Sequence, residues 1–315
     1  MKLLLDTNVW SYIADAQALP KLLGARRRNM EFLVAPASVT EARGLSDAKL
    51  RKRLLAVMTH SAWKRLMAET YLESEEIKQA LQAARPDWAI DGDQKDFKRF
   101  RHYFLRSKGG FWDAARDDAT LPVTDESLRE HSENALARQE VRDIRDRFKN
   151  GAQTGATDHL QKNMVDVEPP LFEARSIEYW RLESAHVLRN ELCVYASPYR
   201  ECLDCFLNVE AMLEDTAGFN HVWFSEVRPE QLKRQWLRSS MNYLQRWHKP
   251  TNGSPADSQL ASHLIDADYF VTADKNFARC IDKIHVEAPF TTAKPFKISA
   301  STAGIEELVA FGEQS

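Results

Sequence analysis

The chain of 315 residues lacks any apolar run near the roughly 20 residues that a membrane-spanning helix needs. Its first apolar stretch, residues 3–5, is too short for the core of a secretory signal peptide and is followed directly by Asp6. We also find no internal repeat and no low-complexity tract. These absences predict a cytoplasmic protein that has no membrane partner.

Cysteine is scarce as well, with four in the whole chain, which agrees with a reducing compartment. Cys202 and Cys205 form a single Cys-x-x-Cys pair that no second pair follows. We interpret them as buried structural thiols, with a metal or redox role as the alternative. The formal net charge of −3 neither supports nor excludes a nucleic-acid substrate, because clustered rather than total charge governs such binding.

Both ends of the chain show alternating strand and helix patterns. In the N-terminal section we predict strands at 3–5 and 31–35, a helix at 8–23, and a second helix capped by Ser38. In the C-terminal section we predict strands at 221–224, 269–272 and 284–286, and helices at 229–247, from 255, from 274 and at 304–311. This alternation predicts an α/β fold with a central parallel sheet and helices on both faces.

The middle of the chain carries almost no strand signal. Apolar residues recur there at helical spacing, as in Phe97, Phe100 and Phe104 and in Val141, Ile144 and Phe148. A polar stretch with Gly and Pro, residues 150–170, predicts a loop. We therefore expect a discontinuous core, 1–60 and 219–315, interrupted by a large all-helical insertion at 61–218.

Two aspartates follow predicted strands at opposite ends of the chain. Asp6 ends the first apolar run, and Asp274 stands two residues after Thr272. Ligands of open parallel sheets bind beyond the carboxyl ends of the strands, so both should lie at one edge. Glu41 and Asp257 stand near the third position of predicted helices. If all four meet, their repulsion calls for a hard cation, Mg²⁺ or Mn²⁺.

Each acid also has an ordinary structural explanation. Ser38 and Glu41 match a capping box, and Asp257 suits a helix N-terminus. Asp6 could form a turn, and Asp274 could cap a helix. The order of the four acids within one α/β frame is what favours a shared site.

The chain resembles the PIN-domain nucleases. The residues that carry the resemblance are Leu-Leu-Leu-Asp6-Thr7-Asn8-Val9, Pro36-Ala37-Ser38-Val39-Thr40-Glu41, and the stretch from Asp257 through Tyr-Phe-Val-Thr272-Ala-Asp274 to Phe277. They cover the two ends, about half of the chain. The resemblance implies a PIN-like α/β/α sandwich and a metal-dependent endoribonuclease. It further implies that Asp6, Glu41, Asp257 and Asp274 are the catalytic, metal-holding residues, with Asn8 and Thr272 in support.

The long insertion departs from the small toxin ribonucleases of that family and leaves the substrate open. A toxin or defence-type effector is one role that the resemblance suggests. The expected partners are an RNA substrate, with an inhibitor protein or other regulator and a second copy of the chain as further candidates.

One helical stretch, residues 95–108, mixes cations with aromatic residues. Lys98, Arg99, Arg101 and Arg106 would face outward from it, either as an ordinary solvated surface or as a contact for RNA phosphates.

Three rival functions remain. The chain could be a non-catalytic RNA-binding or protein-interaction module on the same fold, or a nuclease that acts on single-stranded DNA. An aspartyl-phosphate phosphatase would need a second Asp two residues after the first, where this chain has Asn8.

Overall fold

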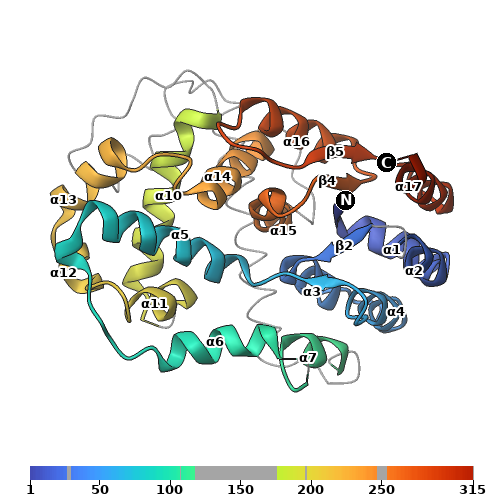
Figure 1. Cartoon of the computed structure of the whole chain (residues 1–315), viewed down its shortest axis with the longest axis horizontal. Coiled ribbons are helices and arrows are strands. Elements are labelled where there is room, and N and C mark those ends of the chain that lie inside the picture. Colours follow the sequence, from blue (N-terminus) through green and yellow to red (C-terminus); the bar gives the residue numbers. More distant parts are fainter. Residues whose placement is uncertain (27–29, 107, 118–175, 196, 247–253, 315) are drawn as a thin grey trace.

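A single sheet of five parallel strands organises the chain (Figure 1). In the computed structural model the described residues are 1–26, 30–106, 108–117, 176–195, 197–246 and 254–314. The strands are β1 (Lys2–Leu5), β2 (Glu31–Val34), β3 (Lys64–Arg65), β4 (Tyr269–Thr272) and β5 (Lys294–Lys297), arranged in the order β3-β2-β1-β4-β5. The strand order reverses between β1 and β4, which places a topological switch point in the centre of the sheet.

β1 is the central strand, and its sequence explains why. Leu3, Leu4 and Leu5 are all fully buried, as expected where both faces of a parallel sheet are covered. Leu3 pairs with Phe32 of β2 on one side and with Tyr269 of β4 on the other.

Helices cover both faces of the sheet, as the sequence predicted. Leu4 and Leu33 point into one core and Leu3 and Leu5 into the other. The first core packs against α5 (Glu69–Ala84), α10 (Ser176–Cys193), α14 (Lys233–Arg246) and α16 (Lys275–Glu287). The second packs against α1 (Thr7–Asp15), α2 (Leu19–Arg26), α4 (Ala48–Met58) and α17 (Thr302–Gln314).

Most of the described middle section is helical. The remaining helices of the described residues are α3 (Pro36–Arg43), α6 (Lys95–Leu105), α7 (Phe111–Asp117), α11 (Pro198–Leu203), α12 (Val209–Glu214), α13 (Thr216–His221) and α15 (Ser254–Ala261). The same residues include the short helical segments η1 (Pro86–Trp88), η3 (Val222–Glu226) and η4 (Ser262–Ile265). The predicted helix through Phe97, Phe100 and Phe104 is confirmed as α6. The residues Val141, Ile144 and Phe148 and the predicted loop at 150–170 lie outside the described residues.

The prediction of an all-helical insertion at 61–218 is wrong near its start. Lys64 and Arg65 form β3, which pairs with Leu33 and Val34 of β2. A strand of two residues is too short to show the alternation by which strands are recognised in a sequence.

The predicted strand at 284–286 is also wrong. These residues belong to α16, where Phe277, Cys280, Ile281 and Ile284 make one buried helical face. The fifth strand is β5, whose sequence is Lys-Pro-Phe-Lys and which pairs with β4 at the edge of the sheet. Pro295 has no backbone N–H to donate. It is tolerated in β5 because an edge strand forms backbone hydrogen bonds with a neighbouring strand on one side only.

Two further predictions need correction. Residues 221–224 are the end of α13 and the π-helical turn η3, in which Trp223 stacks on Phe219 with ring centroids 5.3 Å apart. The single helix predicted at 8–23 is two helices, α1 and α2. The chain breaks between them near Gln17, whose φ of 50° is left-handed and so ends a right-handed helix.

The predicted strand at 269–272 and the helices after Asp274 and at 304–311 are confirmed as β4, α16 and α17. Cys202 and Cys205 are buried, as predicted. None of the described helices is both long and apolar enough to cross a membrane.

Candidate active site

Asp6 and Asp274 lie at the carboxyl edge of the sheet, on the two strands that flank the switch point. Asp6 directly follows β1, and its backbone N–H donates to the carbonyl of Val271 on β4 at 3.0 Å. Asp274 follows the end of β4 by two residues. The structure therefore places both strand-end acids where open α/β sheets bind ligands.

Asn8 and Thr272 fix the carboxylate of Asp6. The Thr272 hydroxyl and the Asn8 side-chain amide each donate to Asp6 Oδ2 at 2.6 Å. Asn8 Oδ1 in turn accepts a bond from the backbone N–H of Ala273 at 3.3 Å. Asp6 itself is 6% exposed, so these two donors stabilise a buried carboxylate. The two residues predicted to support the acids are thus in direct contact with one of them.

Asp274 has a structural role beside its position at the sheet edge. Its Oδ1 accepts from the N–H groups of Asn276 at 2.6 Å and Phe277 at 3.1 Å and so caps the N-terminus of α16. Its own N–H donates to Thr272 Oγ1 at 2.9 Å. The cap orients the carboxylate, because both bonds use the same oxygen.

Glu41 and Asp257 reach the same region from two helices that pack against each other, α3 and α15. Burial raises the pKa of Asp257 well above its usual range, and repulsion from Asp6, Glu41 and Asp274 acts in the same direction. Burial likewise raises the pKa of Asp6 to about 7, with added repulsion from Glu41 and then Asp274, while the hydrogen bond from Thr272 opposes the shift. The four acids are close enough for their charges to interact.

Gln245 is a site residue that the sequence did not reveal. Its side-chain amide donates to Asp257 Oδ2 at 3.0 Å from the last turn of α14. This bond favours the ionised form of Asp257 against the burial and repulsion around it. A glutamine near the end of an amphipathic helix carries no signal that separates it from an ordinary surface residue.

The start of α3 differs from the prediction. The helix begins at Pro36, so Glu41 is its sixth residue, and Ser38 does not cap it. A buried acid from another helix does so instead, since Glu69 of α5 accepts from the N–H of Ala37 at 3.1 Å. Glu69 therefore sets the position of the helix that carries Glu41.

Glu69 belongs to a buried charge network beside the acids. His263 lies 3.5 Å from Glu69 Oε1 through Nε2 and 2.9 Å from Asp266 Oδ2 through Nδ1. Burial alone would lower the pKa of His263, but the hydrogen bond to Asp266 and the nearby carboxylate of Glu69 raise it. Arg234 completes the network with bonds of 2.8 and 2.9 Å to the two oxygens of Asp266. His263 and Asp266 thus hold α5, α14 and η4 together.

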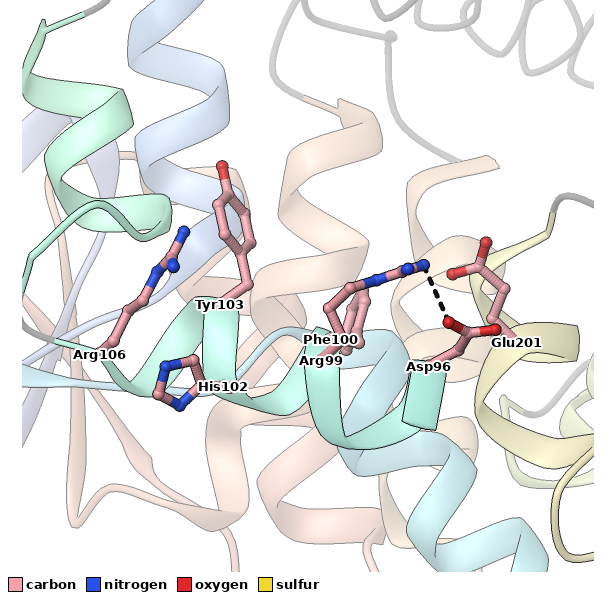
Figure 2. Close-up of a pocket in the computed structure, with 7 residues that line it drawn as sticks. All are labelled: Asp96, Arg99, Phe100, His102, Tyr103, Arg106 and Glu201. Atoms are coloured by element: carbon pink, nitrogen blue, oxygen red, sulfur yellow. Dashed lines mark ion pairs between the residues drawn. The ribbon is translucent and has the colours of Figure 1, made fainter. Parts of the chain in front are cut away.

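The cations predicted to contact nucleic acid lie on α6 and at its C-terminal end. Lys98, Arg99, Arg101 and Arg106 are all exposed. α6 packs against α7, which packs against α3. A pocket of about 410 Å³ lies along this helix (Figure 2). It is lined by Asp96, Arg99, Phe100, His102 and Tyr103 of α6, by Arg106 directly after α6, and by Glu201 of α11.

The donor set of the acid site suits a hard cation, since all four predicted ligands are carboxylates. Two of them have pKa values raised by burial and mutual repulsion, which a bound divalent ion would relieve. Among the described residues, no three His, Cys, Asp or Glu side chains already stand in a metal-binding arrangement. Metal binding would therefore require these side chains to draw closer together.

No protein-family model, curated protein or solved structure matches the chain.

Proposed function

We propose that the chain is a divalent-metal-dependent endoribonuclease built on a PIN-like α/β/α core with a helical insertion. One observation carries this proposal: Asp257 lies close enough to Asp6, Glu41 and Asp274 for their charges to raise its pKa. The four acids come from four separate parts of the fold. Buried carboxylates that repel one another cost stability unless a cation neutralises them. Their place at the switch point of the sheet agrees with a ligand site rather than with a structural cluster.

Asp6, Glu41, Asp257 and Asp274 would hold Mg²⁺ or Mn²⁺. Such an ion supplies an activated water and stabilises charge on a phosphodiester oxygen. The role of the protein is to keep the carboxylates ionised and oriented. Asn8 and Thr272 orient Asp6, Gln245 orients Asp257, and the hydrogen bonds that they donate favour the ionised carboxylates against the effect of burial.

The test is cleavage of defined tRNA, rRNA, mRNA and single-stranded DNA with and without Mn²⁺. We expect wild type to cleave RNA only with the metal, and Asp6→Asn to lose cleavage while it keeps the circular dichroism spectrum of wild type. Asp282→Asn, which removes an exposed acid of α16, is the matched control and should cleave normally. Equal cleavage by wild type and Asp6→Asn would contradict the assignment of the active site. Cleavage of single-stranded DNA alone would show that the protein is a deoxyribonuclease.

A non-catalytic module is the second candidate, favoured by the lack of a ready-made metal group among the described residues. Calorimetric titration with Mn²⁺ separates the two functions. Binding that Asp257→Asn abolishes supports the nuclease, and absence of binding by wild type supports the module.

A further inference from the structure

α6 presents cations and an aromatic ring on one exposed surface. Phe97 of this helix packs inward on Tyr71 with ring centroids 5.1 Å apart. Lys98, Arg99 and Arg101 face outward. The ion pair between Arg99 and Asp96, at 3.1 Å, has side chains that are 76% and 63% exposed, so it contributes little and a phosphate could replace it.

Tyr103 lines the pocket beside these cations. The residue is 37% exposed, and its ring makes T-shaped contacts with Phe104 and Phe111, with centroids 5.5 and 6.3 Å away. The guanidinium of Arg106 lies 5.8 Å from the centroid of the Tyr103 ring. Figure 2 shows Tyr103 and Arg106 at one end of the pocket, and Arg99, Asp96 and Glu201 at the other. A fixed aromatic ring beside arginines is the arrangement on which unpaired bases stack.

The cations continue from α6 toward the edge of the sheet. Arg116 of α7 and Arg65 at the end of β3 both donate to the carbonyl of Thr59, at 2.8 and 3.1 Å. Arg65 also lies over the ring of Trp112, 5.3 Å from its centroid. In Figure 1, α6 leads into α7, which lies next to α3, the helix that carries Glu41.

We propose that α6 is the binding surface for an unpaired segment of the RNA substrate, with one base stacked on Tyr103 in the pocket and the phosphates on Arg99 and Arg106. This inference rests on the proposed ribonuclease function and names its substrate class as single-stranded RNA. The carboxylates of Asp96 and Glu201 line the same pocket and are acceptors for the amino group of a base. A double helix keeps its bases stacked inside and cannot place one in this pocket.

Binding is tested separately from cleavage, with the full-length Asp6→Asn protein in EDTA. The probe is a fluorescein-labelled single-stranded RNA of about 12 nucleotides, within the site sizes common for single-strand binders. Anisotropy gives the affinity, and a salt series gives the number of phosphates bound. Arg99→Glu and Arg106→Glu should each weaken binding, and each should reduce the slope of log K against log salt by about 0.7 for every phosphate that the variant no longer binds.

Lys52→Glu on α4 is the matched control, because Lys52 is an exposed helical cation outside α6. It should bind like the parent. An equal loss in Lys52→Glu, or no loss in the two α6 variants, overturns the proposal.

The base pocket has its own test. Tyr103→Ala should lose affinity by about 5-fold to 100-fold, the range for one stacked base, whereas Tyr103→Phe should keep it. An RNA without bases at its central positions should bind Tyr103→Ala and Tyr103→Phe equally. The proposal is overturned if duplex RNA binds as tightly as the single-stranded probe. It is also overturned if an acidic peptide displaces the probe at the same concentration of negative charges. Absence of cleavage by wild type with Mn²⁺, together with intact α6-dependent binding, would count against the nuclease function alone.

Discussion

The hydroxyl of Thr272 donates a hydrogen bond of 2.6 Å to Asp6 Oδ2, although the two residues are 266 positions apart in the chain. The bond exists because β1 and β4 are neighbours in the sheet, with Leu5 opposite Val271. Thr272 also accepts from the N–H of Asp274 at 2.9 Å. One buried side chain therefore connects the two strand-end acids of the proposed site.

Replacing Thr272 by Val tests that connection. The change keeps the shape but leaves the carboxylate of Asp6 and the N–H of Asp274 without this partner, which costs about 1–3 kcal/mol for a buried group. We expect lower stability in urea and a higher Mn²⁺ concentration at half-maximal cleavage. Thr302→Val, at an exposed position, should change neither. A fully active Thr272→Val with normal metal dependence would show that the hydroxyl has no role at the site.

Gln245→Ala removes the donor that holds Asp257. Removal of a residue that hydrogen-bonds to a metal ligand typically lowers metal affinity or activity about 10-fold to 100-fold, and we expect a loss in roughly this range. The measurement is cleavage rate against Mn²⁺ concentration, in which saturating metal should recover much of the loss. Gln79→Ala, an exposed glutamine of α5, serves as control. A loss that excess metal does not reduce would contradict a positioning role.

Mn²⁺ should stabilise the folded protein, since a ligand that binds only the native state adds about 2.7 kcal/mol at one hundred times its Kd. Differential scanning fluorimetry would show a higher Tm for wild type and Asp282→Asn. Asp257→Asn should begin with a higher Tm than wild type without metal, because it removes a carboxyl group whose ionised form burial and the three neighbouring acids disfavour. It should gain little from Mn²⁺. A wild-type Tm that does not change when Mn²⁺ is added would contradict the proposed metal site.

Arg234→Ala should strongly destabilise the protein. Arg234 is 6% exposed and bonds both oxygens of Asp266 and the carbonyl of Ser262. Its loss breaks this ion pair and leaves the partly buried Asp266 carboxylate with His263 as its partner. Breaking a buried ion pair costs up to about 3–5 kcal/mol. Arg53→Ala breaks an exposed ion pair with Asp15 and should cost about 1 kcal/mol or less. Urea denaturation gives the free energy of unfolding of both variants. Similar decreases in Arg234→Ala and Arg53→Ala would contradict this prediction.

Glu76 should make stability fall as the pH rises. Burial raises the pKa of Glu76 to about 7, against opposing interactions with Arg234. Between its ordinary pKa near 4.5 and pH 7 the folded state keeps a proton that the unfolded state has lost, so rising pH favours unfolding. The effect is at most about 3 kcal/mol. Glu76→Gln should have a flatter profile of unfolding free energy than wild type from pH 5 to pH 8, whereas parallel profiles would contradict the shift.

Local patterns predicted the elements with strong periodicity. The apolar runs of β1 and β4 are buried strands where the sequence placed them. The phenylalanines at helical spacing lie on α6, where Phe97 is buried. The predicted strands at 221–224 and 284–286 failed because short apolar runs fit a buried helix equally well. β5 went unpredicted because its two lysines are exposed and its other two residues are only partly buried.

The sequence alone determined that Asp6 and Asp274 end two apolar strands and that polar Asn8 and Thr272 stand beside them. Only the tertiary structure decided that β1 and β4 are neighbours, that Gln245 holds Asp257, and that Glu69 rather than Ser38 caps α3. The physical reason is that periodicity reports which residues are buried. The partner of a buried polar group is chosen by strand order and helix packing, which join residues far apart in the chain.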